Sequence, residues 1–252
     1  YEILIGLVGS EMCIRDRFGS DGLEGCKHST FEILSNSIDE ARDGHGNKII
    51  LTHYNDNSIE VEDFGRGCPV DYNEKEQRFN WELVYCELYA GGKYDNNSGD
   101  NYEFALGLNG LGACATQYAS EYMDVEVYRD GYKYDLHFEK GENIGGLKKE
   151  ETKQKKTGTK THWKPDLDVF TDIKIEKEYF EEVLKKQAVV NPNIQFIYRY
   201  QNEDGNFEEE VFCYENGIAD YVAEIAGESA LTSIQYFEGE RIGRDREDKK
   251  DY

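Results

Sequence analysis

Apolar residues recur at helical spacing near the start of the chain. Phe31, Leu34 and Ile38 lie three or four residues apart, and the pattern predicts an amphipathic helix from about residue 26 to 43. Gly44 and Gly46 follow it and mark its end. Further helices are predicted at residues 81–89, 113–119, 174–190 and 218–225.

Strand signals occupy much of the remaining sequence. Alternating apolar and polar positions or β-rich runs predict strands at residues 48–54, 58–64, 123–129, 132–139, 159–164, 193–200, 207–214 and 233–237. Asn55-Asp56-Asn57 joins the first two strands, and Asp130-Gly131 joins the third to the fourth, so both pairs are predicted hairpins. The segment from Lys148 to Lys156 is charged and predicted to be exposed.

Composition indicates a folded protein with an acidic surface. The chain has 252 residues, with 29 Lys and Arg against 52 Asp and Glu, a net charge of −23. A chain of this charge repels phosphate and does not favour nucleic acid over a broad surface, although a local pocket can still hold a phosphorylated small molecule with a metal. Hydrophobic residues make up 38% of the chain, and no apolar run approaches the roughly 20 residues of a membrane span.

Six scattered cysteines form no Cys-x-x-Cys pair and have no histidine at zinc-finger spacing. This usage is typical of a reducing compartment, so we expect a cytoplasmic protein.

The chain divides into three predicted parts. Residues 1–17 resemble the translation of a transposase-type sequencing adapter, and we interpret them as an assembly artefact in place of the native N-terminus. Residues 18–230 are predicted to form the main domain. Residues 231–252 begin a strand and become charged, which suggests the truncated start of a further domain.

The first helix carries candidate chemistry. Glu32 and Asn36 lie one turn apart on one face, and His28 lies one turn before Glu32, so it can orient that carboxylate. A carboxylate can accept a proton, and an amide oxygen can hold a hard cation. On local pattern alone, a solvated helix face is the more ordinary explanation, and a surface histidine explains His28 equally well.

Two glycine-containing loops could approach a ligand closely. Asp63-Phe64-Gly65-Arg66-Gly67-Cys68-Pro69 follows a predicted buried strand, where Asp63 could accept a hydrogen bond from a base amine. Gly107-Leu108-Asn109-Gly110-Leu111-Gly112 precedes a helix, an arrangement that favours phosphate. Neither loop matches a P-loop or a Rossmann fingerprint. The polar loop before the second has the composition of a lid.

Four stretches in a fixed order carry a family resemblance. They are Glu32-xxx-Asn36 with Asp39-Glu40, Asp63-x-Gly65-Arg66-Gly67, Gly107-x-Asn109-Gly110-x-Gly112, and Thr157-Gly158-Thr159. Together they resemble the Bergerat-fold (GHKL) ATPases. The sequences Asn36-Ser37-Ile38-Asp39-Glu40-Ala41 and Ala90-Gly91-Gly92-Lys93 are similar to motifs of the type II topoisomerase branch of this family. That branch comprises the B subunits of bacterial DNA gyrase and topoisomerase IV. The resemblance implies an α+β two-layer sandwich, with a mixed, mostly antiparallel sheet packed against helices.

The resemblance also implies roles for single residues. Glu32 would be the general base, Asn36 the Mg²⁺ ligand and Asp63 the adenine-reading carboxylate. Thr159 would support Asp63 through water. The resemblance gives the remaining ATP-binding positions as Glu40 paired with Arg66, Gly67 and Pro69 in the same loop, Lys93 and Tyr102 in the lid, Gly107, Leu108, Asn109, Gly110, Leu111 and Gly112 around the phosphates, and Arg129 at the pocket mouth.

The function implied is ATP binding and hydrolysis that closes a dimeric clamp around DNA, with an A-type DNA-cleaving subunit as partner and no membrane. Asn109 departs from the histidine of many members. The N-terminal arm and the following transducer domain are expected to be missing, so hydrolysis and dimer formation of this chain stay open. The alternatives are a nucleotide-binding fragment without turnover, or another GHKL protein of the chaperone, mismatch-repair or sensor-kinase type.

Overall fold

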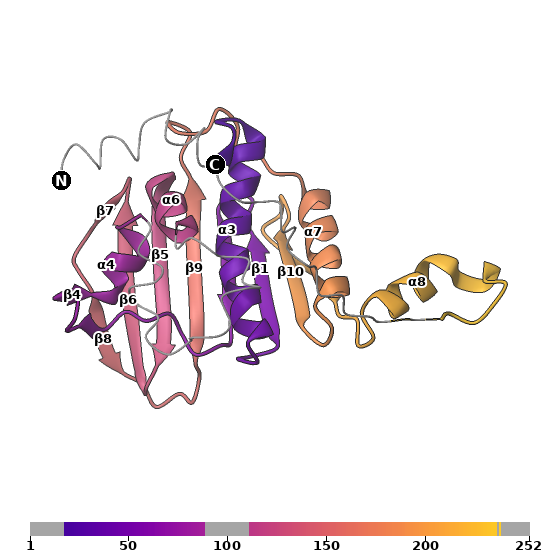
Figure 1. Cartoon of the computed structure of the whole chain (residues 1–252). Helices are drawn as coiled ribbons and strands as arrows, with labels where there is room; N and C mark the ends of the chain where they lie inside the picture. The colour runs from indigo at the N-terminus through magenta and orange to yellow at the C-terminus, as the bar shows by residue number, and fades with distance from the viewer. Residues whose placement is uncertain (1–17, 89–110, 236, 238–252) are drawn as a thin grey trace, which may run out of the picture.

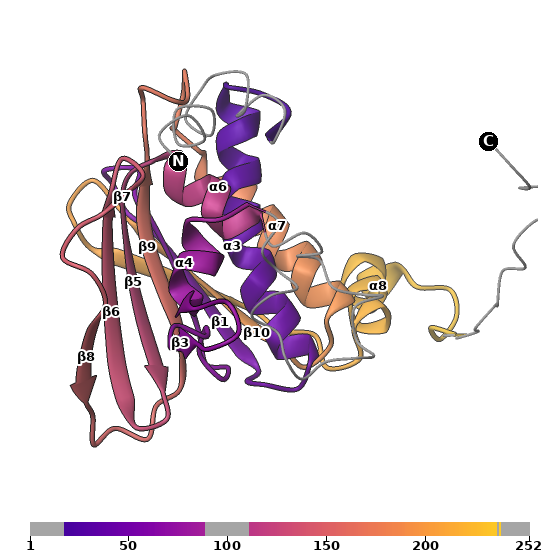
Figure 2. The ribbon, with the colours of Figure 1, turned by 60° about the vertical axis from the view of Figure 1, so that its left-hand side comes forward.

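One large mixed sheet and a layer of helices make up the fold. The computed structural model describes residues 18–88, 111–235 and 237. Figure 1 shows α3 (Leu23–Arg42), α4 (Asn80–Tyr85), α6 (Gly112–Tyr118) and α7 (Lys177–Val190) on one face of the sheet. Figure 2 shows the two layers from the side. In both views α8 (Ile218–Ala226) lies away from the sheet, and none of its residues is buried.

Nine strands of the described residues form the main sheet. Its order is β11-β10-β1-β2-β9-β5-β6-β7, with β8 also paired to β6. The strands are β1 (Lys48–His53), β2 (Ile59–Asp63), β5 (Ser120–Arg129), β6 (Tyr132–Glu139), β7 (Glu142–Asn143), β8 (Lys148–Glu151), β9 (Gly158–Pro165), β10 (Gln195–Gln201) and β11 (Phe207–Phe212). A separate hairpin pairs β3 (Tyr72–Asn73) with β4 (Arg78–Phe79).

The sheet is mixed because one of its pairs is parallel. β1 runs parallel to β10, with Ile50 opposite Ile197, whereas its other neighbour β2 is antiparallel. β9 is inserted between β2 and β5, antiparallel to both. This order brings the carboxyl ends of β2 and β5 to the same edge of the sheet as the start of β9.

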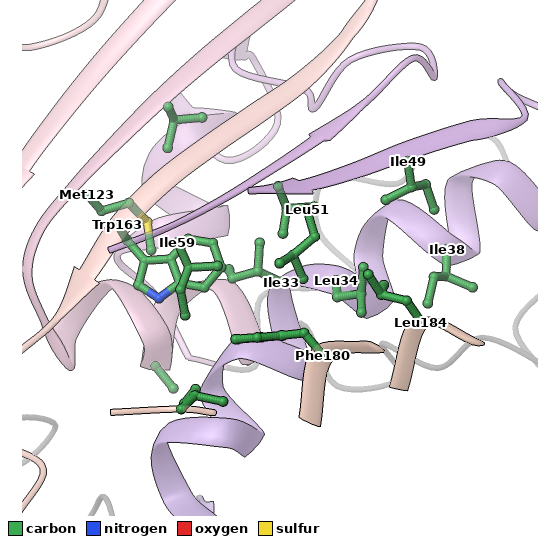
Figure 3. Packing of buried hydrophobic residues seen from close by; sticks show 14 of the residues in the cluster. Ile33, Leu34, Ile38, Ile49, Leu51, Ile59, Met123, Trp163, Phe180 and Leu184 are labelled. Atoms are coloured by element: carbon green, nitrogen blue, oxygen red, sulfur yellow. The ribbon is translucent and has the colours of Figure 1, made fainter. Parts of the chain in front are cut away.

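The core lies between the sheet and the helices. α3 buries Ile33, Leu34 and Ile38 at helical spacing, and Figure 3 shows them facing Leu51 and Ile49 of β1. Trp163 of β9 is fully buried in the same layer. Burying such side chains contributes about 1.5–3 kcal/mol each, so α3 is held against the sheet by its apolar face.

Most predicted elements are confirmed, with shifts at their ends. The predicted hairpins form, and Asp130 and Gly131 both adopt the positive φ (53° and 81°) of a tight hairpin turn. The helix predicted at 81–89 spans only Asn80–Tyr85. The prediction of a strand at 233–237 was wrong for the described part of that range, which forms no strand and pairs with no described strand. No described helix is long and apolar enough to cross a membrane.

Candidate functional site

The polar face of α3 presents Glu32, Asn36 and Glu40 at one-turn intervals. Because Ile33 and Ile38 point into the core, these three residues lie on the face away from the sheet or at its margin. Asn36 is exposed, and the Glu32 side chain retains 18% exposure. The Nε2 of His28 lies 3.3 Å from Oε1 of Glu32, as their spacing predicted. A water-accessible carboxylate therefore stands one turn from an exposed amide.

Asp63, the last residue of β2, is a buried carboxylate held by uncharged donors. Its Oδ1 accepts the backbone N–H groups of Gly65 (3.0 Å) and Thr159 (3.2 Å), and its Oδ2 accepts the hydroxyl of Ser37 (3.2 Å). Only 7% of the residue is exposed. Among the described residues Oδ2 accepts a single donor, so a lone pair remains for a ligand N–H.

Burial dominates the electrostatics of Asp63. Desolvation raises the pKa of its carboxyl to about 6, although the hydrogen bonds from Gly65, Thr159 and Ser37 act in the opposite direction. At neutral pH the group is ionised and acts purely as an acceptor. A buried, correctly oriented acceptor is suited to reading an amino group of a ligand.

The start of β9 packs closely against Asp63. Gly158 has φ of +131°, and a side chain there would collide with the carbonyl of Asp63. The next residue, Thr159, was predicted to support Asp63 by its hydroxyl through water. In the structure its amide makes the direct bond, and its hydroxyl accepts the backbone N–H of Cys68 at 2.8 Å. Thr159 thus ties the Asp63 loop to β9 by two hydrogen bonds.

Glu40 and Arg66 form a two-pronged ion pair. The Oε1 of Glu40 accepts both the backbone N–H (2.7 Å) and Nε (2.9 Å) of Arg66, and its Oε2 accepts Nη2 at 2.8 Å. Burial acts against the charged form of Glu40, but the Arg66 hydrogen bonds hold the pKa of Glu40 below its ordinary value. A side chain at Gly65 would overlap Glu40. The pair therefore fixes the Gly65–Gly67 turn to α3.

Arg129 lies at the other side of the same turn. Its Nη1 donates to the carbonyl of Gly67 at 3.1 Å, and its Nε contacts Asp130 at 3.2 Å. Gly67 has φ of +86°, and a Cβ there would press on the backbone of Tyr128. Pro69 follows, and its carbonyl accepts the Cys68 thiol at 3.7 Å. Burial raises the pKa of that thiol to about 12, so it is not a nucleophile at neutral pH.

Gly112 connects the first helix to the second glycine loop. It is the first residue of α6, and a Cβ at this position would overlap the Glu32 carboxylate. Leu111, just before it, is buried. The end of the predicted phosphate loop therefore lies directly against the predicted base.

The structure brings together four of the predicted groups: the Glu32, Asp63, Arg66–Gly67 and Thr159 regions. Six further predicted residues lie outside the described residues: Lys93, Tyr102, Gly107, Leu108, Asn109 and Gly110. The predicted adapter at 1–17 and residues 238–252 also lie outside them.

Ser37 is the residue that sequence reasoning missed. It lies beside Asn36, and its hydroxyl donates to Asp63 across 26 residues of sequence. A buried serine on the apolar side of an amphipathic helix was the only available signal, because such a hydroxyl needs a partner.

A hollow of about 240 Å³ lies on the opposite face of the sheet, away from Asp63. It is lined by residues of β2, β5, β6, β9 and the β7–β8 region, among them Glu126, His137 and Lys160. Several of its charged residues are paired: Lys160 lies 2.7 Å from Glu126, and Asp124 lies 2.6 Å from His137. None of the four carboxylates that line the hollow is buried as Asp63 is, so we do not place the candidate site there.

Comparison with known proteins agrees with the geometry. No protein-family model matches the chain. It is 37% identical to the B subunit of DNA topoisomerase 4 from Escherichia coli over 198 residues (78% of this chain, 30% of the relative). It is 37% identical to the corresponding topoisomerase 4 protein of Bacillus subtilis over 225 residues (88% and 33%). With the B subunit of DNA gyrase from Thermotoga maritima it shares 34% identity over 236 residues (92% and 36%).

A solved structure matches as well. The 43K ATPase domain of Thermus thermophilus gyrase B, in complex with an aminocoumarin, superposes with a TM-score of 0.75 at 29% identity. The match covers 90% of this chain and 56% of that one. The chain spans about a third of the length of the full relatives. These matches do not favour a chaperone, mismatch-repair or sensor-kinase protein. The chain belongs to the family of type II DNA topoisomerase B subunits and has the fold of their ATPase domain.

Proposed function

We propose that this domain binds ATP with Mg²⁺ in the space between α3, the Asp63 loop and α6, and that it hydrolyses ATP there. The observation that carries the proposal is Asp63, a buried carboxylate whose Oδ2 accepts only the hydroxyl of Ser37, a residue of α3, among the described residues. The same helix presents the exposed amide of Asn36 and the partly exposed carboxylate of Glu32. Its ionised form accepts a hydrogen bond from the exocyclic amine of adenine. Guanine presents a carbonyl at the equivalent place, so the same acceptor disfavours it.

Glu32 and His28 supply the proton chemistry in this proposal. Glu32 accepts the proton of a water molecule that attacks the terminal phosphate, and His28, 3.3 Å away, orients the carboxylate. A well-positioned base of this kind contributes roughly 10²–10⁴-fold in rate. Gly112 keeps this carboxylate against the start of α6, since any side chain there would displace it.

Asn36 is the protein's contribution to the metal site. The described residues contain no cluster of three or more side chains that could hold a metal ion. A protein cage for Mg²⁺ is therefore absent from this part of the chain. The exposed Asn36 fits the usual Mg²⁺ arrangement, in which one or two protein oxygens join phosphate and water oxygens. Bound Mg²⁺ would neutralise phosphate charge.

We further propose that the whole protein uses this domain as its relatives' names imply. It would be the B subunit of a cytoplasmic type II topoisomerase, acting on DNA with an A-type subunit and closing as a homodimer. Sequence similarity over most of this chain supports that assignment.

The adenine-reading role is tested by Asp63→Asn. The asparagine can keep its oxygen on the Gly65 and Thr159 amides, and Ser37 can rotate to accept, so the fold is retained. Only the ligand-facing atom changes from acceptor to donor. We expect ATP affinity, measured by calorimetry with and without Mg²⁺, to fall at least roughly 10- to 100-fold. Asp124→Asn, on the opposite face, is the matched control and should bind ATP normally. Equal affinities for both variants would exclude this pocket.

The role of Glu32 is tested separately. Glu32→Ala should keep ATP binding and lose whatever turnover the wild-type domain shows, measured by phosphate release. Turnover at the wild-type rate would remove Glu32 as the base. Absence of turnover in the wild type, with ATP bound, would instead favour a nucleotide-binding domain that hydrolyses ATP only with its missing partners.

A further inference from the structure

Thr161 places a buried hydroxyl in an otherwise apolar row of the sheet. It lies on β9 two residues before Trp163, so both side chains are on the helix-covered face, where Figure 3 shows Trp163 in the core. Only 5% of Thr161 is exposed. Its cross-strand neighbours are Val61 of β2 and Val125 of β5, both buried. A hydroxyl in this position needs a hydrogen-bond partner that the two valines cannot provide.

The partner comes from Tyr85, the last residue of α4. Tyr85 is 3% exposed, and its ring centroid lies 5.7 Å from that of Phe138 on β6. The Tyr85 hydroxyl is hydrogen-bonded to the hydroxyl of Thr161 and to the thiol of Cys68. Burial raises the pKa of Tyr85 well above its ordinary value, so the hydroxyl stays neutral and can donate. Side chains from α4, β9 and the Asp63 loop therefore meet at one point.

Cys68 is where these contacts reach the Asp63 loop. Its backbone N–H already donates to the Thr159 hydroxyl at 2.8 Å, and its thiol adds a second tie, to Tyr85. Both ties lead to β9, the second by way of α4. Three residues earlier, the Gly65 amide donates to the Asp63 carboxylate. A shift of Cys68 would therefore move Gly65 and disturb the orientation of that carboxylate.

Core packing alone does not require the two hydroxyls. Phe in place of Tyr85 and Val in place of Thr161 would keep the shape of both side chains without their oxygen atoms. Replacing both partners of a buried hydrogen bond by apolar groups of the same shape is nearly neutral for stability. The hydroxyls are therefore better explained by the loop that they hold than by the stability of the fold.

We propose that Tyr85 and Thr161 are positioning residues for base recognition, an inference that rests on the proposed ATP site. They hold Cys68, and with it the loop that follows Asp63, at the distance from β9 at which the Asp63 carboxylate faces the amine of adenine. Neither side chain needs to touch the nucleotide. Their effect is on the selection of the base and not on the phosphates, which are proposed to lie beside Glu32.

The test compares two double variants of the whole chain. The first combines Tyr85→Phe with Thr161→Val and removes both hydroxyls. The control combines Tyr122→Phe with Thr52→Val, which are the same two chemical changes on the outer face of the sheet. Urea denaturation verifies that both variants are folded under the conditions of the binding measurements.

Two ligands are titrated by calorimetry with Mg²⁺: ATP, and purine riboside triphosphate, which lacks the 6-amino group. For the first variant we expect ATP affinity to fall roughly 3- to 10-fold, the scale of one buried hydrogen bond. The analogue should lose clearly less affinity, because it makes no hydrogen bond to Asp63 that a misplaced loop could weaken. The control should bind both ligands as the wild type does. Equal losses for the two ligands, an unchanged ATP affinity, or the same loss in the control would overturn the proposal.

Cys68→Ala tests the same contact from its other end. It removes the thiol and keeps the amide that donates to Thr159, so it should reduce the preference for ATP over the analogue to a similar degree. Adding it to the first double variant should change little, since the three groups act through one contact. Additive losses would contradict this. If the double variant unfolds, an unchanged preference in Cys68→Ala alone overturns the proposal.

The wild-type protein separates this proposal from the ATP site itself. Absence of ATP binding by the wild type would overturn both. ATP binding that Asp63→Asn weakens, together with normal binding and base preference in the variant that lacks the Tyr85 and Thr161 hydroxyls, would overturn the positioning role alone.

Discussion

Carboxylates on the two faces of the sheet have different kinds of hydrogen-bond donor. On the helix-covered face, Asp63 is held by two backbone amides and a hydroxyl, with no cation in the set. On the outer face, Glu126 contacts the ammonium groups of both Lys133 (3.2 Å) and Lys160 (2.7 Å). The pKa of Asp63 is raised by burial, whereas burial of Glu126 is outweighed by hydrogen bonds from Lys160 and Lys133, which lower its pKa.

The difference separates the carboxylate that we propose binds a ligand from carboxylates that pair with lysines across the strands of the sheet. Uncharged donors orient Asp63 and leave its charge uncompensated, so a ligand donor gains from meeting it. Cross-strand partners satisfy Glu126 completely, and exposed pairs of this kind contribute about 0–1 kcal/mol to stability. The number of charged residues in a hollow is therefore a poor guide to a ligand-binding site. Whether those charges are already paired with opposite charges is a better guide.

The largest effect should come from closing the space beside Asp63. Gly158→Ala places a methyl group against the Asp63 carbonyl, at a φ of +131° that L-residues avoid. We expect the free energy of unfolding to fall by at least about 3 kcal/mol, measured by urea denaturation. Gly131→Ala is the control, because its φ is also positive but its Cβ would meet open space; it should cost about 1–2 kcal/mol. Similar costs for both would show that contact with Asp63 is not tight.

The next effect concerns the pH dependence of stability. The pKa of Asp63 is about 6 in the folded protein, above its ordinary value of 3.8. The Asp63 carboxyl therefore binds a proton more tightly in the folded state than in the unfolded state. The stability that this protonation contributes is complete below about pH 4 and is lost as pH rises through 6. Relative to Asp63→Asn, the wild-type free energy of unfolding should therefore decline by up to roughly 2–3 kcal/mol across this window. A constant difference between the two proteins would show that Asp63 is not desolvated.

The smallest effects compare two ion pairs. Glu40→Ala removes the acceptor of three hydrogen bonds from Arg66 and should destabilise the protein by about 1–2 kcal/mol. Arg66→Ala keeps its backbone donor to Glu40 and should cost less than about 1 kcal/mol. Lys160→Ala on the outer face should cost similarly little and leave ATP affinity unchanged. Loss of ATP affinity in Lys160→Ala would break the distinction between the two faces.

Local patterns were enough to predict most of the helices and the hairpins, whereas the roles of the candidate site residues came from the family resemblance. Helical spacing from Phe31 to Ala41 placed Glu32 and Asn36 on one face, and Asp130-Gly131 marked its hairpin correctly. These features depend on neighbours within a few residues. The resemblance then linked Asp63 to Thr159, which are 96 residues apart and in contact in the structure.

Contacts between distant segments could not be predicted in this way. Nothing in β1 indicates that β10 will lie parallel to it, because a buried strand has the same pattern in either direction. Ser37 has an ordinary helical position, and only the tertiary fold brings its hydroxyl to Asp63. Likewise, the Thr159 hydroxyl accepts the Cys68 amide, and not a water beside Asp63, because the fold places Cys68 next to it.

The parallel pairing of β1 with β10 has a consequence for how the chain folds. β1 ends at His53, but β10, which pairs with it, ends only at Gln201. Likewise β2 ends at Asp63, but β9, which pairs with it, ends at Pro165. During synthesis from the N-terminus, more than half of these 252 residues must be made before β1 or β2 has a neighbouring strand on both sides. Long-range closures of this kind slow folding and prolong exposure of unpaired strand edges. We therefore expect the nascent domain to depend on protection by chaperones until β10 emerges from the ribosome.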